Sequence, residues 1–559
     1  MHLRLALPLA LPLALVLAPA SFAQWSAVEQ ARLLPSTTSP LSGYGSAVAL
    51  DGSTCAVGMP RLSTGLSGRA VVHVRSSGVW TQQAELLAAD DAVGNGLGCA
   101  LALDGDTLVV GARGATTGGF LGAGAAYVFV RNGSTWTQQA KLVPNDPEQS
   151  AEFGYAVALD GDTCAIGAPQ STSASTLFAG ATYVFVRGGA TWTLQQRIVP
   201  NAAFNAIYGS RSGRALALRG NTLLIGAPLS FDLINNAIST GRAFEWTRAG
   251  SSWSQSAEIV ANDTPDQRQF ACSIDFDGTR AIFGAWAESH LPSNIHVGSA
   301  YVFKRGATWT QEQKLLGAGT DDADAFGSSV ALDGTTAIVG APNGASTGGA
   351  TSGTVRLFDF DGSSWSERLA LSGSATSDAD RLGTAVALDA DFALAGAELA
   401  DVPSAGTPGE AYVWGVQPPP TSSFCTAKTN SLGCVPMIGS SGTPSVSSPN
   451  AFVVSVVQVL NQKQGLMFYG YAPAAAPFQG GSLCVQPPTQ RLPATNSGGN
   501  ASGSSCTGSY AYDFNAHIDS GLDPALVAGA DAYCQFWMRD PASASTTGLS
   551  NGLRVHIQP

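Results

Sequence analysis

The sequence predicts an all-β protein, namely a seven-bladed β-propeller closed by the N-terminal strand and followed by a small β-sandwich domain. Three observations support this. Tryptophans recur at intervals of 55 to 61 residues, a short hairpin with a Gly-Ala strand end occurs seven times, and the piece missing from the last repeat stands at the start of the chain. Repeats of this length each form one unit that buries its apolar face by stacking on neighbours. The repeating tryptophans are Trp25, Trp80, Trp136, Trp192, Trp253, Trp309 and Trp365.

Residues 1–23 have the pattern of a secretory signal peptide. Arg4 gives a positive start, residues 5–18 are apolar, and Ser-Phe-Ala at 21–23 offers a small-x-small cleavage pattern. A membrane anchor is the alternative, but the apolar stretch is short and is broken by Pro8 and Pro12. We therefore expect a secreted protein without membrane insertion.

The composition excludes a class of partner. Charged residues make up 12% of the chain, the net charge is −12 and the pI is near 4.9. A nucleic-acid binder needs a basic surface that replaces the counterions of phosphate, so we expect no nucleic-acid partner.

The third repeat shows the expected strands most clearly. Apolar and β-branched runs are bounded by Gly, Asp and Pro, which is typical of short strands. The dipeptide Asp160-Gly161 between the first two runs is a hairpin signal, and a primed turn with positive φ at both residues is expected there. The expected strands are 156–159, 163–168, 181–186 and 191–196.

The final repeat is incomplete at its end. The strand at Glu410–Val416 is followed by no tryptophan strand, whereas Trp25–Pro35 resembles the tryptophan strand Trp136–Pro144. The N-terminal strand should therefore lie beside Glu410–Val416 and complete the last sheet, which gives a propeller over residues 24–416. Such closure removes exposed sheet edges.

The repeat resembles the FG-GAP repeat. Phe153-Gly154 precedes a strand, and Gly-Ala-Pro follows at 167–169, 226–228 and 340–342. FG-GAP repeats build the propeller of integrin α chains and occur in secreted bacterial proteins. The resemblance covers about 390 residues and implies extracellular binding or adhesion, outside the cell or at the surface of a bacterium.

Integrin-type repeats often carry a calcium loop between the first two strands. Here that connection is a tight turn, as in Leu103-Asp104-Gly105-Asp106. Two carboxylates on such a turn do not furnish the six to eight oxygens that calcium takes. We therefore assign no metal site and no cofactor, and calcium remains only an ion that the resemblance implies.

Several patterns have a functional and a structural interpretation. Acidic clusters between repeats are either weak cation sites or, as we favour, solvated connecting loops. The segment Gly344–Gly348 matches the sequence motif of a nucleophile elbow but lies in a loop between strands. Glu288, His290 and His296 share another loop, and we expect surface residues in both loops. The acidic clusters are Asp90-Asp91, Asp146 with Glu148, Asp263 with Asp266, Asp321-Asp322 with Asp324, and Asp378 with Asp380.

No catalytic set stands out. The innermost strands are mostly Ala, Val, Leu and Ser, with Arg214 and Asp275 as isolated exceptions. The tryptophans recur at one strand position per repeat, which favours core packing over a ligand-stacking surface. We therefore expect no enzyme.

The nine cysteines divide into two groups. Cys55, Cys99, Cys164 and Cys272 lie in the repeats and are expected to be buried strand residues. In the tail, nearness in sequence suggests the disulfides Cys425–Cys434 and Cys484–Cys506, which leaves Cys534 odd.

A proline-rich linker is expected at 417–424, and a β-sandwich-like domain at 425–559. Its role is open between carbohydrate binding, surface attachment and stabilisation. Five strands are expected in it, at 451–457, 466–470, 510–514, 532–538 and 553–557.

Together these features favour a secreted, non-catalytic, monomeric binding or adhesion protein that recognises an extracellular protein or carbohydrate through the propeller loops. The alternatives are an extracellular polysaccharide hydrolase or lyase with a site in the propeller channel, and a structural surface-layer component. The variable loops are 59–67, 112–123, 168–179, 227–240, 285–297, 341–352 and 397–408.

Overall fold

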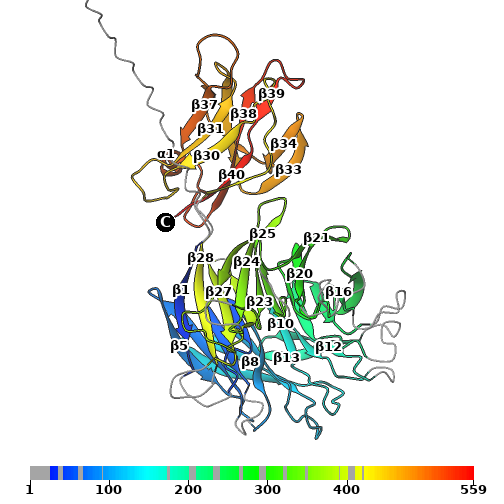
Figure 1. Cartoon of the computed structure of the whole chain (residues 1–559). Coiled ribbons are helices and arrows are strands. Elements are labelled where there is room, and N and C mark those ends of the chain that lie inside the picture. Colours follow the sequence, from blue (N-terminus) through cyan, green and yellow to red (C-terminus); the bar gives the residue numbers. More distant parts are fainter. Residues whose placement is uncertain are drawn as a thin grey trace, which may run out of the picture. The chain divides into compact units, whose positions relative to one another are not determined.

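The computed structural model divides the chain into two compact units, Ser26–Gln417 and a unit whose described part lies within Pro418–Pro559 (Figure 1). The residues described are 26–35, 42–60, 67–90, 92–172, 177–199, 209–230, 240–263, 269–288, 297–318, 324–345, 351–389, 391–400, 409–417 and 421–558.

The described part of the first unit contains seven four-stranded antiparallel sheets, arranged as the blades of a β-propeller. We number the sheets as blades in chain order. Blade 1 contains β2 (Val48–Asp51), β3 (Thr54–Met59), β4 (Arg69–Ser76) and β5 (Val79–Leu86); blade 2, β6 (Leu97–Asp104), β7 (Thr107–Ala112), β8 (Ala125–Asn132) and β9 (Thr135–Leu142); blade 3, β10 (Ala156–Asp160), β11 (Thr163–Ala168), β12 (Ala181–Gly188) and β13 (Thr191–Ile198).

The remaining blades follow the same order. Blade 4 contains β14 (Ala215–Arg219), β15 (Thr222–Ala227), β16 (Arg242–Ala249) and β17 (Ser252–Ile259); blade 5, β18 (Ile274–Phe276), β19 (Arg280–Ala285), β20 (Ser299–Arg305) and β21 (Trp309–Leu315); blade 6, β22 (Ser329–Asp333), β23 (Thr336–Ala341), β24 (Thr354–Phe360) and β25 (Trp365–Leu371); blade 7, β26 (Leu382–Asp389), β27 (Phe392–Ala397), β28 (Glu410–Gln417) and β1 (Ser26–Leu33).

The first strand completes the last sheet. β1 pairs antiparallel with β28, from Ser26 opposite Gln417 to Leu33 opposite Ala411, as the sequence predicts. The predicted alignment of Trp25 with Trp136 is wrong. Counted from the bulge that both outer strands carry, Ala27 occupies the tryptophan position, opposite Val416. Trp25 itself lies outside the described residues.

Glycine recurs at the strand ends because neighbouring blades touch there through backbone alone. A Cβ on Gly167 would lie 1.9 Å from the carbonyl oxygen of Gly213 in the next blade. The same contact joins the last blade to the first, where a Cβ on Gly396 would lie 1.8 Å from the carbonyl oxygen of Gly45. No side chain fits at these points, which explains the repeated Phe-Gly and Gly-Ala.

The tight hairpin differs from the predicted one. Asp51 pairs with Thr54, so the two central residues are Gly52 and Ser53, and of these only Gly52 has a positive φ. This pattern fits a type II′ turn rather than the predicted turn with Asp and Gly at its centre. The aspartate ends the strand instead, and its carboxylate is available to the neighbouring blade.

The second unit is a β-sandwich. A seven-stranded sheet and a three-stranded sheet enclose one core, in which Val454 and Val456 of the smaller sheet pack with Met467, Phe536 and Val555 of the larger. The strands are β29 (Thr421–Phe424), β30 (Met437–Ser441), β31 (Val453–Val459), β32 (Gln464–Gly470), β33 (Pro473–Phe478), β34 (Gly481–Val485), β35 (Gln490–Arg491), β36 (Thr495–Asn496), β37 (Gly508–Asp513), β38 (Asp531–Arg539), β39 (Thr547–Leu549) and β40 (Gly552–His556).

Two details of this unit correct the sequence prediction. The linker predicted at 417–424 is too long, because Gln417 ends β28 and β29 pairs with β40. A short helix, α1 (Phe514–Asp519), also follows β37, and Asp513 caps it by accepting from the amide of Ala516. Among the described residues, no helix has the length and hydrophobicity needed to span a bilayer.

The four tail cysteines form disulfides, but not in the predicted pairs. The bonds are Cys425–Cys484 and Cys434–Cys506. Nearness in sequence misled the prediction, because Cys425 follows β29 and meets β34, whereas Cys434 meets the segment before β37. The other five cysteines are free; Cys55, Cys164 and Cys534 are buried, and Cys99 and Cys272 are partly buried.

Candidate functional site

A blade has two ends of different character. The connection from its second to its third strand and the link to the next blade lie at one end, which we call the loop face. The turns between the first and second strands and between the third and fourth strands lie at the other end, which we call the hairpin face. This follows from the antiparallel order of four strands.

One variable loop, 112–123 of blade 2, is described throughout. Its tip is a small hairpin in which the amide and carbonyl of Thr117 bond with those of Phe120 at 3.2 and 3.0 Å. The link to blade 3 supports this tip, since the amide of Ser150 donates to the carbonyl of Leu121 at 2.9 Å. The loop is therefore held in one conformation, with Phe120 44% and Leu121 67% exposed.

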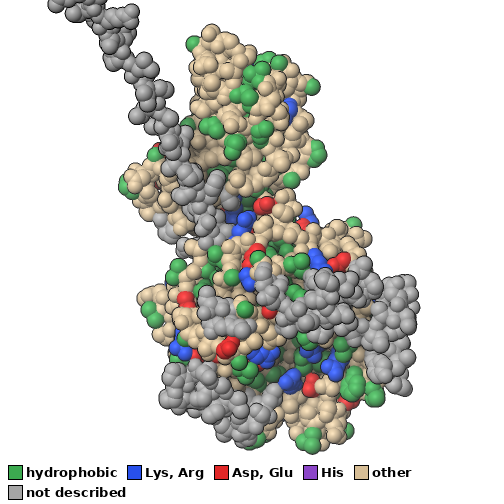
Figure 2. All heavy atoms as spheres, in the orientation of Figure 1, with side chains coloured by type: hydrophobic (Ala, Val, Ile, Leu, Met, Phe, Trp, Pro, Cys, Tyr) green, Lys and Arg blue, Asp and Glu red, His purple; other side chains and the backbone are tan. Residues whose placement is uncertain are grey.

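Blade 3 presents a similar pair. Leu177 and Phe178 are 65% and 44% exposed, and the carbonyl of Phe178 accepts from the amide of Arg211 at 3.0 Å. Figure 2 shows hydrophobic side chains at the lower margin of the propeller, where the blue and cyan loops of Figure 1 run. We call Phe120, Leu121, Leu177 and Phe178 the apolar loop patch. Residues 61–66, 173–176, 231–239, 289–296, 346–350 and 401–408 of the variable loops lie outside the described residues.

The acidic clusters between blades are mostly structural. Asp146 accepts from the Tyr183 hydroxyl at 2.8 Å and pairs with Arg197 at 2.9 Å. Asp90 pairs with Lys141 at 2.5 Å, and Asp263 with Lys314 at 2.7 Å. The side chains of Asp90, Asp146 and Asp263 are 51%, 42% and 37% exposed, so these aspartates are solvated as expected, and each also pairs with a basic residue.

A signal for these contacts was present in the sequence. The tyrosine of the third strand follows its acid by 37 residues in Tyr183–Asp146 and by 38 in Tyr301–Asp263. A spacing that stays nearly the same from repeat to repeat predicts that the contact between the tyrosine and the acid recurs in each.

The other acids have local roles. Glu148 accepts from the amide of Thr172 at 2.7 Å, Asp378 from that of Thr351 at 3.0 Å, and Asp380 from that of Ser377 at 2.5 Å. Asp324 is buried. Asp91, Asp266, Asp321 and Asp322 lie outside the described residues.

The loop with Glu288 gives no metal site in its described part. Glu288 is buried, accepts from the Tyr301 hydroxyl at 2.8 Å and pairs with Lys314. His290 and His296 lie outside the described residues, as does Ser346 of the Gly344–Gly348 pattern. Within the described ranges, no group of three or more His, Cys, Asp or Glu is placed to hold a metal ion.

The repeated tryptophans pack between blades. Trp136 and Trp192 are buried, and their indole nitrogens donate to Gln83 at 2.8 Å and to Gln139 at 2.9 Å in the preceding blades. Arg131 lies over the Trp136 ring at 5.3 Å. The arginine covers a ring face and the hydrogen bond uses the N–H edge of the buried indole, so the tryptophans form core rather than a ligand surface.

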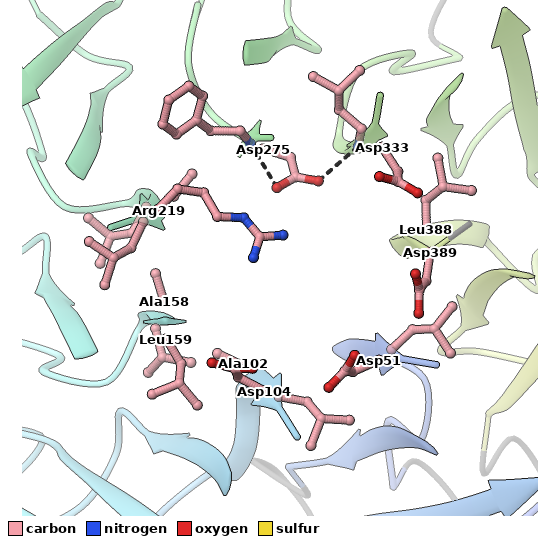
Figure 3. Close-up of a pocket in the computed structure, with 18 residues that line it drawn as sticks. Asp51, Ala102, Asp104, Ala158, Leu159, Arg219, Asp275, Asp333, Leu388 and Asp389 are labelled. Atoms are coloured by element: carbon pink, nitrogen blue, oxygen red, sulfur yellow. Dashed lines mark hydrogen bonds between the residues drawn. The ribbon is translucent and has the colours of Figure 1, made fainter. Parts of the chain in front are cut away.

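A cavity of about 260 Å³ lies where the innermost strands end on the hairpin face (Figure 3). Charged residues and leucines both contribute to its lining. Figure 3 shows Arg219 pointing toward the centre, with Asp51, Asp104 and Asp389 across from it. The lining includes Leu50, Leu103, Leu159, Leu218, Leu332 and Leu388, one position before the charged residues, and the acids Asp51, Asp104, Asp275, Asp333 and Asp389.

The rim carboxylates connect neighbouring blades. Asp51 accepts from the amide of Gly105 at 2.6 Å, and Asp104 from that of Gly161 at 2.6 Å. Asp389 of the last blade accepts from the amide of Gly52 in the first. The sequence prediction missed these groups because it placed the aspartates at the turn centres, facing solvent.

The two innermost polar residues noted in the sequence have different surroundings. Asp275 lines the cavity and accepts from the amide of Leu332 at 2.8 Å, and burial raises its pKa. Burial and the carboxylates of Asp389 and Asp277 also raise the pKa of Asp333. Arg214 is not part of the lining, and its guanidinium lies 5.2 Å over the Tyr155 ring.

Comparison with known proteins identifies the repeat. The family model of the FG-GAP repeat matches residues 80–129, 136–185, 253–303 and 309–358. Each match starts at one of the repeating tryptophans and ends in the third strand of the next blade. A search of curated proteins gives no match to the chain.

Proposed function

We propose that this FG-GAP repeat protein is a secreted, non-catalytic binding protein that recognises an extracellular protein or glycan through its loop face. The apolar loop patch carries this proposal. Single exposed apolar residues are ordinary, but four on two adjacent loops, each held by backbone hydrogen bonds from the next link, form a contact surface. Preordered apolar anchors bind with little loss of conformational entropy.

The export of the protein rests on two supports. The N-terminal pattern is that of a signal peptide, and the second unit contains two disulfides. Disulfides persist in oxidising compartments and are rare in the cytosol.

The experiment probes the mature full-length chain on a glycan array and on an array of purified extracellular proteins. The test variant combines Leu121→Asp with Leu177→Asp. Val79→Asp is the matched control, because Val79 is 59% exposed and lies at the hairpin end of β5. We expect the double variant to weaken the strongest signal at least tenfold and the control to leave it unchanged. Silence on both arrays, or equal loss in the control, would contradict the proposal.

A polysaccharide hydrolase or lyase is a second candidate, favoured by the five carboxylates around the cavity. The raised pKa of Asp333 beside Asp389 is what a general acid beside an ionised carboxylate requires. Four of the five, however, already accept backbone amide protons, so we favour binding. Release of reducing sugar by the wild type, abolished by Asp333→Asn, would establish this candidate instead.

A surface-layer component is the remaining alternative. It requires self-assembly, whereas the binding protein proposed here is a monomer. Sedimentation of the mature chain separates the two, since assembly into sheets or large particles would favour the structural role.

A further inference from the structure

The cavity on the hairpin face contains a departure from the repeat. Five blades place an aspartate before the hairpin glycine and blade 7 places Asp389 before Ala390, whereas blade 4 places Arg219 before Gly220. Gly220 keeps its bond to the preceding blade, since its amide donates to Asp160 at 2.6 Å. The turn itself is therefore unchanged, and only the side chain that reaches the cavity differs.

This departure removes a structural contact. Asp389, Asp51, Asp104 and Asp160 each accept from the glycine amide of the following blade. An arginine has no acceptor for the next amide in the series. Arg219 cannot make this inter-blade hydrogen bond, and it places a positive charge in the cavity instead. We take this exchange as a sign that Arg219 has a function in the cavity.

Arg219 is poorly explained as an internal counterion. Its closest carboxylate contact is with Asp160, at 3.7 Å between Nη1 and Oδ1, and its side chain is 57% exposed. Most ion-paired arginines of this unit approach within 3 Å, as Arg131 does with Asp106 at 2.6 Å. The guanidinium instead points toward the centre of the cavity (Figure 3).

The charges around the cavity are unequal and separated. Five carboxylates and one guanidinium contribute to the lining, with Asp51, Asp104 and Asp389 across from Arg219. A leucine one position earlier in each of six innermost strands also lines the cavity. A complementary ligand has more positive than negative charge, an anionic group at one end and an aliphatic part between.

We propose that this cavity binds a cationic amino acid, with the ligand carboxylate on Arg219, its amino groups on Asp51, Asp104 and Asp389, and its methylenes over the leucines. The volume of about 260 Å³ suits a ligand of this size rather than a polymer. The site lies on the opposite end of the blades from the apolar loop patch, so it is independent of the function proposed above.

Calorimetric titration of the mature full-length chain tests the site with three probes. L-lysine carries all the required groups, cadaverine lacks the carboxylate, and L-norleucine lacks the side-chain amine. We expect L-lysine to bind at least tenfold more tightly than either of the others. Arg219→Gln should weaken L-lysine at least tenfold without weakening cadaverine, because only the carboxylate contact is lost.

Two further variants separate binding from folding. Asp104→Asn keeps an oxygen for the Gly161 amide but removes a charge, so it should weaken L-lysine and cadaverine alike while the melting temperature stays nearly constant. Lys304→Gln is the control for Arg219→Gln, because Lys304 is exposed at the hairpin end of β20 and outside the lining.

Three outcomes would overturn the proposal. No binding of L-lysine at millimolar concentration would make Arg219 an internal counterion. Cadaverine binding as tightly as L-lysine would make the rim a general cation site. An equal effect of Lys304→Gln and Arg219→Gln would place the binding outside the cavity.

Discussion

Arg32 in the first strand and Glu410 in the last blade form an ion pair across 378 residues of sequence, with Nε 2.7 Å from Oε2. Glu410 is fully buried, and its carboxylate also accepts from the Tyr412 hydroxyl at 2.6 Å. The pair holds β1 against β28 at the loop end of the strands. It is therefore the charged component of the contact that completes the last sheet.

Removal of Arg32 should destabilise the first unit strongly. Arg32→Ala leaves the buried Glu410 carboxylate with the Tyr412 hydroxyl as its side-chain donor, and breaking a buried pair in this way typically costs about 3 kcal/mol. Urea unfolding followed by tryptophan fluorescence measures the loss. Arg381→Ala is the control, since the Arg381–Glu398 pair is partly exposed, unlike the buried Glu410, and should contribute less than about 1 kcal/mol. Equal losses in the two variants would show that the seam does not depend on the pair.

Acid should destabilise blade 1 through His73. The imidazole is buried with its Nε2 2.9 Å from the Tyr44 hydroxyl, and burial lowers its pKa to about 4. In the unfolded chain the pKa is near 6.5, so the unfolded state takes up a proton first as the pH falls. This stabilisation is present above pH 6.5 and is lost as the pH falls toward 4, by about 3 kcal/mol in all.

The double variant Tyr44→Phe, His73→Phe tests this origin of acid sensitivity. It copies the pair Phe153–Phe185, which occupies the same positions in blade 3 with ring centroids 6.2 Å apart. The difference in unfolding free energy between pH 7 and pH 4.5 should shrink relative to the wild type. Carboxylates that titrate in the same range are common to both proteins, so an unchanged difference would show that His73 does not contribute.

The blades were predictable because their signals are local and repeated. In blade 3 the expected strand 163–168 is β11, and the expected strand 156–159 is β10 without its last residue. The placement of β1 beside β28 was predictable for a different reason. The last repeat lacks its fourth strand, and a matching strand stands at the start of the repeats. Its register was not, because Trp25 precedes the bulged residue Gln30 by five residues whereas Trp136 precedes the bulged residue Gln139 by three, which moves the tryptophan position to Ala27.

The cavity was predictable only in part. The sequence showed that Arg219 departs from the repeated aspartate, but not that the aspartates end strands and reach the neighbouring blade. The position of these aspartates depends on the type of the hairpin turn at Gly52 and its equivalents. The apolar loop patch carried no periodic signal, because the loops vary in length and composition.

The disulfide pairs give a direct chemical prediction. Digestion of the unreduced protein followed by mass spectrometry should yield peptides that join Cys425 to Cys484 and Cys434 to Cys506. A loop of 59 residues closed by the first bond corresponds to about 4 kcal/mol in the chain-entropy model. Replacing Cys425 and Cys484 together by Ala should therefore destabilise the second unit by about that amount. Cys534→Ala, which removes a free thiol, is the control; a peptide joining Cys425 to Cys434 would contradict the assignment.

The last prediction concerns the hydrogen bonds that buried indole nitrogens donate to the preceding blade, because Trp80 lacks this bond. Trp136 donates to Gln83, the bulged residue of β5, at 2.8 Å. Gln30 is the bulged residue of β1 and so stands in the equivalent place, yet the buried indole nitrogen of Trp80 has no partner. Gln83→Met should therefore cost about 1–3 kcal/mol, since it leaves a buried donor unsatisfied.

Gln30→Met supplies the matched control for Gln83→Met. It makes the same chemical change at the same position of another outer strand, but it breaks no indole hydrogen bond, so its cost in urea unfolding should stay below about 0.5 kcal/mol. A loss in Gln30→Met equal to that in Gln83→Met would mean that the glutamine stabilises the bulge itself. The tryptophan contact would then be a consequence of that bulge rather than a source of stability between blades.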